Sequence, residues 1–297
     1  MTGLSHFFVF IFLIINWLSV INAQEPDADQ GELTPLPHAE VIVRLLNFKD
    51  ESVEDCSLPC FAGIRPDKTT LSEIQELSVG LFDGDEAVLV QFDRPFERED
   101  GMLDYILRLN HLNIAGSFSF SFIVSSEQEV LQRFQMRLNR PENWLESRGL
   151  GISEVLAVLG EPDELYISIS AAQPSYFDIA LGYETKGTLF RYKYFFEPEQ
   201  LTQSEEPIPL CGSWSKTFSI DVWIQSVDED TYVDLLEEKL RLGETANTEE
   251  IVYRAFWPME RMTNWNIEDW TQLMVENSEW CFDALSYDEL LAAGYSY

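Results

Sequence analysis

Four cysteines are the residues of this chain that could form covalent cross-links. Cys56 and Cys60 lie four positions apart, whereas Cys211 and Cys281 lie 70 positions apart. An even number of cysteines in an exported chain is typical of two disulfides, and four cysteines allow three connectivities. Proximity in the sequence favours Cys56–Cys60 and Cys211–Cys281. A zinc site is the alternative, but no histidine lies near the second pair, and an oxidising compartment disfavours thiolate ligands.

Histidine is scarce, which limits nucleophilic and acid–base chemistry. The chain has 3 histidines, and His6 belongs to the apolar N-terminal segment described below. We expect His38 to be exposed beside a linker, and His111 to occupy a turn or another satisfied polar position. Neither lies in a nucleophile motif, and the motifs G-x-S-x-G, H-E-x-x-H and G-x-x-x-x-G-K-[ST] are absent from the sequence. We therefore assign no catalytic residue and no cofactor.

Carboxylates are abundant, and the charge that they give the chain excludes several partners. The chain has 52 Asp and Glu against 19 Lys and Arg, a formal net charge of −33. This charge repels phosphate backbones and anionic lipid, so we expect no nucleic acid and no membrane surface as partner. A paired-carboxylate hydrolase stays an alternative, although no pair of acids stands out. Calcium, bound by oxygen ligands in two loops, is a further alternative, and solvated turns are favoured there. Its candidate ligands are Asp83, Asp85, Asp228 and Asp230.

Tryptophan is concentrated near the C-terminus, where it could bind a ligand or fill a core. Four of the 8 tryptophans lie between Trp257 and Trp280. Aromatic faces can stack on sugars or anchor a protein partner, and we take Trp257, Trp265 and Trp280 as candidate binding residues. Core filling is the favoured alternative, because Trp270 and Met274 are spaced four apart, as on one buried helix face.

The N-terminus predicts export. The first 23 residues contain no Lys, Arg, Asp or Glu, and residues 7–21 are almost wholly apolar. Fifteen residues are short for a membrane span of about 20 but fit the core of a signal peptide, which we place at residues 1–23. An uncleaved anchor is the alternative. Residues 24–37 are polar and proline-bearing, as in a linker. No later stretch is apolar and long enough to span a membrane, so we expect a secreted or extracytoplasmic protein.

Two similar series of elements follow the linker. In residues 38–147, a capping box at Thr70–Glu73 predicts a helix, and a second capping box at Ser126–Glu129 predicts another with Val130, Phe134 and Leu138 inward. Strands are predicted between them, the clearest being the strict Ser–Phe alternation of 117–122. The predicted strands of this unit are 87–92, 103–109 and 117–122.

Residues 148–242 repeat this order. A short helix from Gly151 ends at Gly160, strands follow, and a helix covers 232–240. The predicted strands are 165–169, 177–183, 189–194 and 218–224. Residues 243–297 should form a Trp-rich region with helices at 267–275 and from the capping box at Ser286 to Gly294. The expected fold is therefore α+β, with two repeated helix–antiparallel sheet–helix units and a small helical C-terminal region.

Two short motifs carry resemblances. The segment from Cys56 through Pro66, C-x-x-P-C-aromatic-x-G-I-x-P, followed by Thr69 and Thr70, resembles a signature of uncharacterised exported bacterial proteins, and Leu156 to Asp163 fits that group too. Residues 151–162 are similar to the start of small envelope lipoproteins of the SmpA/OmlA type, whose architecture β-lactamase inhibitory protein repeats share. The second resemblance implies a scaffold that binds proteins without catalysis. The chain departs from it by lacking a lipid-bearing cysteine.

We expect a non-catalytic exported binding module that recognises a protein or a glycan. A carboxylate-based extracellular hydrolase and a structural envelope component are the alternatives. The sequence leaves the ligand and the oligomeric state open.

Overall fold

We analysed a computed structural model of the protein. It describes residues 64–74, 88–92, 95–98, 101–111, 117–140, 150–170, 175–195, 205–225, 229–240, 247–248, 251–252 and 256–292. All of them belong to the unit His38–Tyr297. The predicted signal peptide and linker lie outside these residues, and so do Cys56, Cys60, His38, Asp83, Asp85 and Asp228. Within the described part, no helix combines the length and hydrophobicity that a membrane crossing needs.

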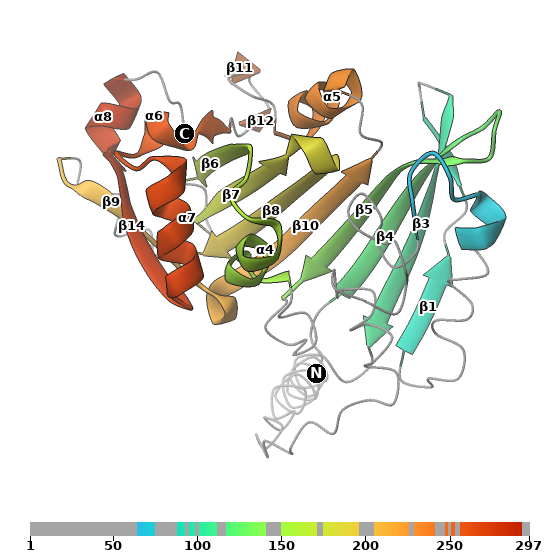
Figure 1. The fold of residues 1–297 in the computed structure, drawn as a ribbon, viewed down its shortest axis with the longest axis horizontal. Helices are drawn as coiled ribbons and strands as arrows, with labels where there is room; N and C mark the ends of the chain where they lie inside the picture. Colours follow the sequence, from blue (N-terminus) through green and yellow to red (C-terminus); the bar gives the residue numbers. More distant parts are fainter. Residues whose placement is uncertain are drawn as a thin grey trace, which may run out of the picture. The chain divides into compact units, whose positions relative to one another are not determined.

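An antiparallel sheet of ten strands dominates the described residues (Figure 1). Its order is β1-β3-β4-β5-β10-β8-β7-β6-β13, and β2 pairs with β3 beside this path. The strands are β1 (Val88–Phe92), β2 (Phe96–Glu97), β3 (Met102–His111), β4 (Ser117–Ser125), β5 (Leu131–Asn139), β6 (Glu164–Ser170), β7 (Tyr176–Tyr183), β8 (Thr188–Phe195), β10 (Thr217–Gln225) and β13 (Trp257–Pro258). Two runs of antiparallel strands thus meet where β5 pairs with β10.

The alternation predicted in β4 is confirmed and shows why these residues form strands. Phe120 and Phe122 are buried on one face of the sheet, while Ser119 and Ser121 face the other way. Phe122 lies opposite Phe134 of β5, with ring centroids 5.5 Å apart. Such cross-strand aromatic pairs stabilise a sheet. The other strands predicted within the described residues are also present; β1 covers 88–92 of the predicted 87–92, and each of the others is extended by one or more residues.

The expected fold of two helix–sheet–helix units is wrong. The helix predicted to open at Ser126–Glu129 is a turn, and the chain continues as β5. Glu129 has a positive φ of 54°, and its amide donates to the carbonyl of Ser125, which closes the turn. Val130, Phe134 and Leu138 have helical spacing, but the buried series 134, 136 and 138 has the period of a strand. The described residues therefore form mainly one antiparallel sheet with a few small helices.

The helices are short, and two of the predicted capping boxes define where helical turns begin. Glu73 accepts from the Thr70 amide at 2.7 Å, and Glu289 accepts from the Ser286 amide at 2.9 Å. The α-helices are α4 (Ile152–Leu159), α5 (Glu229–Leu240), α6 (Met259–Met262), α7 (Ile267–Glu276) and α8 (Tyr287–Ala292), and the 3₁₀ turns are η3 (Glu184–Lys186) and η5 (Trp214–Lys216). Two further sheets pair β9 (Pro207–Ser213) with β14 (Glu279–Ser286) and β11 (Asn247–Thr248) with β12 (Ile251–Val252).

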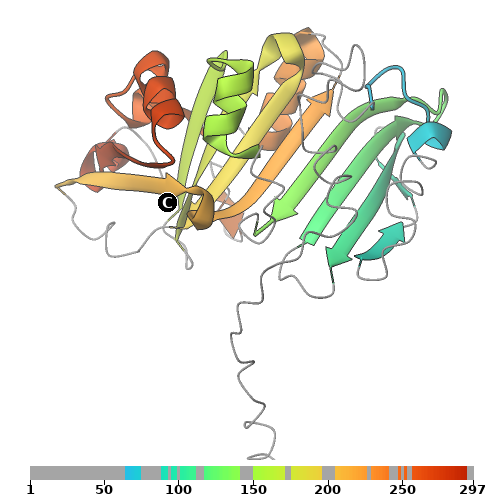
Figure 2. The ribbon, with the colours of Figure 1, turned by 60° about the horizontal axis from the view of Figure 1, so that its bottom comes forward.

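The two faces of the main sheet are covered by different helices (Figures 1 and 2). One face forms the large core with α4 and α7, to which Trp270 and Met274 contribute fully buried side chains. On the other face, α5 packs against strands that carry Trp223 and Leu189. On the first face, α4 packs against α7, and Ile152 and Val155 of α4 share the large core with the sheet.

Ion pairs cross the central strands on the face that α5 covers in part. Arg191 of β8 donates to Asp178 of β7 at 3.1 Å, and Arg137 of β5 donates to Asp221 of β10. Asp178 is fully buried, and this desolvation raises the pKa of its carboxyl, although Arg191 and Lys193 partly offset the effect. Asp221 stands opposite both Arg137 and Arg191 in the strand register, whereas Asp178 stands opposite Lys193 and bonds Arg191 diagonally.

A disulfide joins Cys211 of β9 to Cys281 of β14, as the sequence predicts. The two cysteines face each other in the strand register.

We expect replacement of Cys211 by Ser to lower the free energy of unfolding by about 4 kcal/mol, because the bond closes a loop of 70 residues in the unfolded chain. Urea unfolding with and without reductant measures this loss. Replacing Cys60 should cost much less, since proximity predicts a short loop there. Peptide mapping that links Cys211 to Cys56 or Cys60 would contradict the assignment.

Glu238 of α5 should make stability depend on pH in acid. Desolvation opposes its ionisation, but hydrogen bonds from Lys239 and Arg133 outweigh that effect and lower the pKa of Glu238 to about 2. A depressed carboxyl pKa stabilises the fold above the ordinary value near 4.5, and this stabilisation is lost as the pH falls from there towards 2. Because the side chain is 38% exposed, screening reduces the contribution to about 1 kcal/mol.

Replacing Glu238 by Gln should therefore cost about 1 kcal/mol at pH 7 and almost nothing near pH 2, as measured by urea unfolding across this range. The exposed neighbour Glu237 provides the matched control, and its replacement by Gln should change stability by less than about 0.5 kcal/mol. If Glu238→Gln lowers the unfolding free energy by the same amount at every pH, the ionisation of Glu238 does not stabilise the fold in the way described.

Candidate functional site

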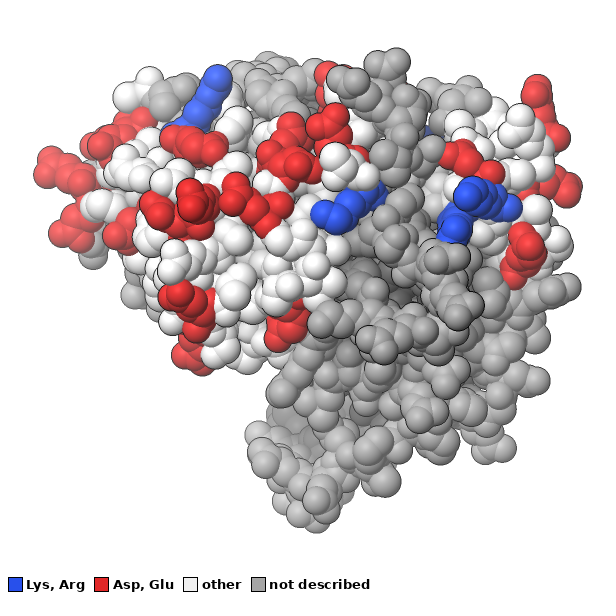
Figure 3. Space-filling model, in the orientation of Figure 1, with Lys and Arg blue, Asp and Glu red and all other residues white. Residues whose placement is uncertain are grey.

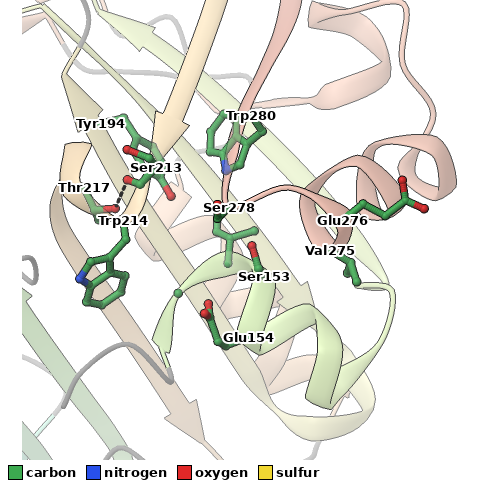
Figure 4. Close-up of a pocket in the computed structure, with 12 residues that line it drawn as sticks. Ser153, Glu154, Tyr194, Ser213, Trp214, Thr217, Val275, Glu276, Ser278 and Trp280 are labelled. Atoms are coloured by element: carbon green, nitrogen blue, oxygen red, sulfur yellow. Dashed lines mark hydrogen bonds between the residues drawn. The ribbon is translucent and has the colours of Figure 1, made fainter. Parts of the chain in front are cut away.

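A pocket of about 380 Å³ lies where three separate chain segments meet (Figure 4). The start of α4 forms one wall, the β8, β9, η5 and β10 segment forms the second, and the end of α7 with the start of β14 forms the third. Its lining residues are Gly151, Ile152, Ser153, Glu154, Tyr194, Ser213, Trp214, Thr217, Val275, Glu276, Ser278 and Trp280. A volume of this size lies at the lower end of the range for small-ligand sites, about 300–1,000 Å³.

Trp280 is positioned by the β9–β14 ladder beside the disulfide. It stands opposite Gly212 in the register, one position from the Cys211–Cys281 pair. A Cβ atom on residue 212 would lie 2.2 Å from the Trp280 ring, so the indole crosses β9 where the chain has no side chain. Backbone register and a missing side chain together fix the place of this ring.

Neighbouring aromatic rings hold Trp280 from several sides. It makes an edge contact with Tyr194, with ring centroids 5.2 Å apart, and a stacked contact with Phe282 at 5.8 Å. Phe177 meets it edge-on at 6.3 Å. Such contacts add to the burial energy of each ring, and Trp280 is only 5% exposed. Its orientation is therefore set before any ligand arrives.

Hydroxyl groups line the pocket, and several already donate their proton elsewhere. Ser153 Oγ donates to the carbonyl of Met274 at 2.8 Å, which ties α4 to α7. Thr217 Oγ1 donates to the carbonyl of Ser213 at 3.0 Å, drawn as a dashed line in Figure 4. A hydroxyl that has donated keeps lone pairs that accept. Ser153 is partly exposed and can thus accept a hydrogen bond from a ligand, whereas Thr217 is buried and also bonds to Tyr194.

Two carboxylates line the pocket, but they are oriented differently. Figure 4 shows the carboxylate of Glu154 on the side of α4 that faces Trp214, whereas that of Glu276 points away from Glu154. Glu276 Oε1 instead accepts a hydrogen bond from Gln272 Nε2 at 2.9 Å in the preceding turn of α7. Glu154 is therefore the acidic group best placed to meet a bound molecule. Burial raises the pKa of the Tyr194 hydroxyl, a hydrogen bond with Thr217 opposes this, and the charge of Glu154 adds a smaller increase.

Hydrogen-bond donors also face the pocket. Figure 4 shows the indole nitrogen of Trp280 on the ring edge towards Ser278 and α4. α4 begins at Gly151 without a side-chain cap, so its first-turn amides lack a partner within the helix. Trp214 contributes its ring alone, because its indole nitrogen is buried. The pocket thus combines donors, acceptors and aromatic surface.

The structure brings one of the predicted binding residues into this pocket. Trp280 lines it, Trp257 lies in β13, and Trp265 packs partly buried against the large core. His111 ends β3 and Asp230 lies in α5. The described residues contain no cluster of three or more His, Cys, Asp or Glu side chains that could hold a metal. The sequence analysis did not identify Trp214, Tyr194 or Glu154, which lie in three distant segments without a common motif.

The surface beside the pocket is acidic. Residues 259–292, which include α7 and β14, carry eight exposed carboxylates against one basic side chain, Arg261. The acids are Glu260, Glu268, Asp269, Glu276, Glu279, Asp283, Asp288 and Glu289. Figure 3 shows acidic side chains over the part of the molecule that holds α7 and β14 in Figure 1. A negative field of this kind attracts cations and repels anions.

The chain matches no family model, no curated protein and no solved structure. The site is therefore interpreted from its own geometry.

Replacing Gly212 by Ala should displace Trp280 and disturb the pocket. The new methyl group would lie 2.2 Å from a ring that Tyr194, Phe177 and Phe282 confine. We expect a loss of about 1–3 kcal/mol in unfolding free energy, as for other overpacked sites, together with a red shift of tryptophan emission. Urea unfolding followed by fluorescence measures both.

A second substitution tests whether Trp280 is the cause. Trp280→Phe replaces the indole by a smaller ring, which relieves the clash with the new methyl group. The double variant Gly212→Ala/Trp280→Phe should therefore lose less unfolding free energy than the two single variants lose in sum. If the losses of unfolding free energy simply add, the destabilisation by Gly212→Ala does not come from its contact with Trp280.

Proposed function

We propose that the protein is an exported, non-catalytic recognition module that binds its ligand in the pocket between α4, η5 and α7. The observation that carries this proposal is the orientation of its polar groups. One carboxylate, Glu154, and one indole N–H, that of Trp280, face a pocket whose second carboxylate points away. Such a set can hold and orient a molecule.

The same arrangement argues against the hydrolase alternative. Glycoside hydrolysis by carboxylates generally uses two acids that flank the scissile bond on opposite sides, one of them with a raised pKa. Glu276 is exposed and hydrogen-bonded to Gln272, so it does not oppose Glu154 across the pocket. None of the twelve lining residues is His, Cys, Lys or Arg, the types on which acid–base and nucleophilic catalysis most often depend.

Preorganisation supports binding. The Cys211–Cys281 disulfide, the strand register and the Ser153–Met274 hydrogen bond fix the three walls before a ligand arrives. A rigid site spends little of its binding energy on ordering its own side chains. The disulfide also supports export, because such bonds persist in oxidising compartments. The uncharged apolar residues 1–23 support it further.

The test compares wild type with Trp214→Ala and with Trp257→Ala, a tryptophan variant outside the pocket lining. Each is applied to defined arrays of oligosaccharides and of synthetic peptides, and each is assayed for hydrolysis of chromogenic glycosides, esters and peptides. We expect capture by wild type and Trp257→Ala, at least tenfold weaker capture by Trp214→Ala, and no turnover. Turnover that Glu154→Gln abolishes would overturn the proposal, and so would capture that Trp214→Ala leaves unchanged.

A further inference from the structure

We infer that the ligand of this pocket is a sugar unit that carries no negative charge, presented by a neutral or amino-bearing glycan. This inference rests on the proposed function and names the class of molecule that the pocket accepts. Three properties of the pocket lead to it: the mixture of hydrogen-bonding groups, the aromatic surface and the charge.

The first property is that donors and acceptors face the same small volume. The Trp280 N–H and the first-turn amides of α4 can donate hydrogen bonds, whereas the Glu154 carboxylate and the lone pairs of Ser153 can accept them. A hydroxyl group both donates and accepts, so a ring with several hydroxyls can satisfy all of these groups together. A ligand that had only donors or only acceptors would leave some of these pocket groups desolvated and without a partner. That loss of hydrogen bonds would lower its affinity.

The second property is the aromatic surface. Trp214 is partly exposed and offers its ring, because its nitrogen is buried. Trp280 contributes the edge that carries its nitrogen, because it stacks on Phe282 and makes an edge contact with Tyr194. One open ring beside directional polar groups suits a molecule with an apolar face and a polar rim. A sugar ring has this character, since its C–H groups form a face and its hydroxyls form the rim.

The third property is charge. None of the lining residues is basic, and the neighbouring surface carries eight exposed carboxylates against one arginine. Sugars with carboxylate or sulfate groups would meet repulsion from Glu154 and from this surface. An amine on the sugar would be attracted to Glu154 instead. The pocket therefore selects against acidic glycans.

A basic protein side chain is the competing ligand, and the pocket fits it less well. Guanidinium and ammonium groups are donors without acceptors. They would satisfy Glu154 but leave the Trp280 N–H and the α4 amides without a partner. A sugar satisfies both sets, so the structure favours it.

The experiment titrates the full mature chain with five soluble probes and follows intrinsic tryptophan fluorescence and calorimetric heat. The probes are cellotriose, chitotriose, a chitosan trimer, tri-galacturonate and a tetra-arginine peptide. We expect saturable binding of at least one neutral or amino-bearing trimer, and at least tenfold weaker binding of tri-galacturonate. The chitosan trimer should lose affinity as salt rises, whereas the neutral trimers should not.

Two matched pairs of variants locate the bound sugar. Trp280→Phe keeps an aromatic ring but deletes the N–H, and it should weaken sugar binding about tenfold, whereas Trp257→Phe should not. Glu154→Gln keeps the shape and should also weaken binding about tenfold, whereas Glu237→Gln on α5 removes the same charge and should have no effect. Unfolding midpoints confirm that each variant folds.

The outcomes separate this inference from the proposed function. Tetra-arginine binding that depends on Trp214 and Glu154, without sugar binding, would overturn the sugar inference and leave the recognition module intact. Preference for tri-galacturonate, or sugar binding that Trp280→Phe and Glu154→Gln leave unchanged, would also overturn it. If no probe binds, the inference fails. If Trp214→Ala also leaves capture on the arrays unchanged, the proposed function fails with it.

Discussion

The contact between Trp280 and the bare backbone at Gly212 is the constraint on which the pocket depends. The indole can cross β9 because residue 212 has no Cβ, and the crossing places one ring edge in the pocket and brings the ring into contact with Tyr194 and Phe282. The disulfide one register position away holds the two strands at the spacing that this contact requires. Two segments separated by 70 residues thereby act as one rigid wall.

The other two walls depend on the sheet. β8 supplies Tyr194, and β10 supplies Thr217 where the strand leaves η5, so both are fixed by hydrogen bonding between neighbouring strands. α4 lies on the same face through Ile152, Val155 and the partner helix α7. Because Ser153 donates to the backbone of α7, the helix start that carries Glu154 keeps its position relative to Trp280.

Sequence patterns predicted the elements that are set by neighbouring residues. They missed the strand pairings and the pocket, which depend on residues far apart in the chain. The Ser–Phe alternation of β4 and the capping boxes at Thr70 and Ser286 are local, and all three are present. β5 was mistaken for a helix, because its apolar residues fit both periods and its preceding turn resembles a cap. β9 contains Pro207, Pro209 and Gly212, which are uncommon in strands, so nothing local predicted that it pairs with β14. The cysteine count was the one sequence signal that connected these segments, and the pocket needed that long-range pairing.

The ion pairs across β5, β10, β8 and β7, whose carboxylates are buried, affect how the sheet is assembled. Side chains alternate between the faces of a strand, so sliding β10 by one residue would carry Asp221 into the apolar layer and Val222 among the arginines. The cost of a buried carboxylate without its partner makes such a slipped sheet much less stable than the native one. The charged row therefore favours the native alignment of these strands during folding, because only that alignment keeps Asp221 among the arginines and Val222 in the apolar layer.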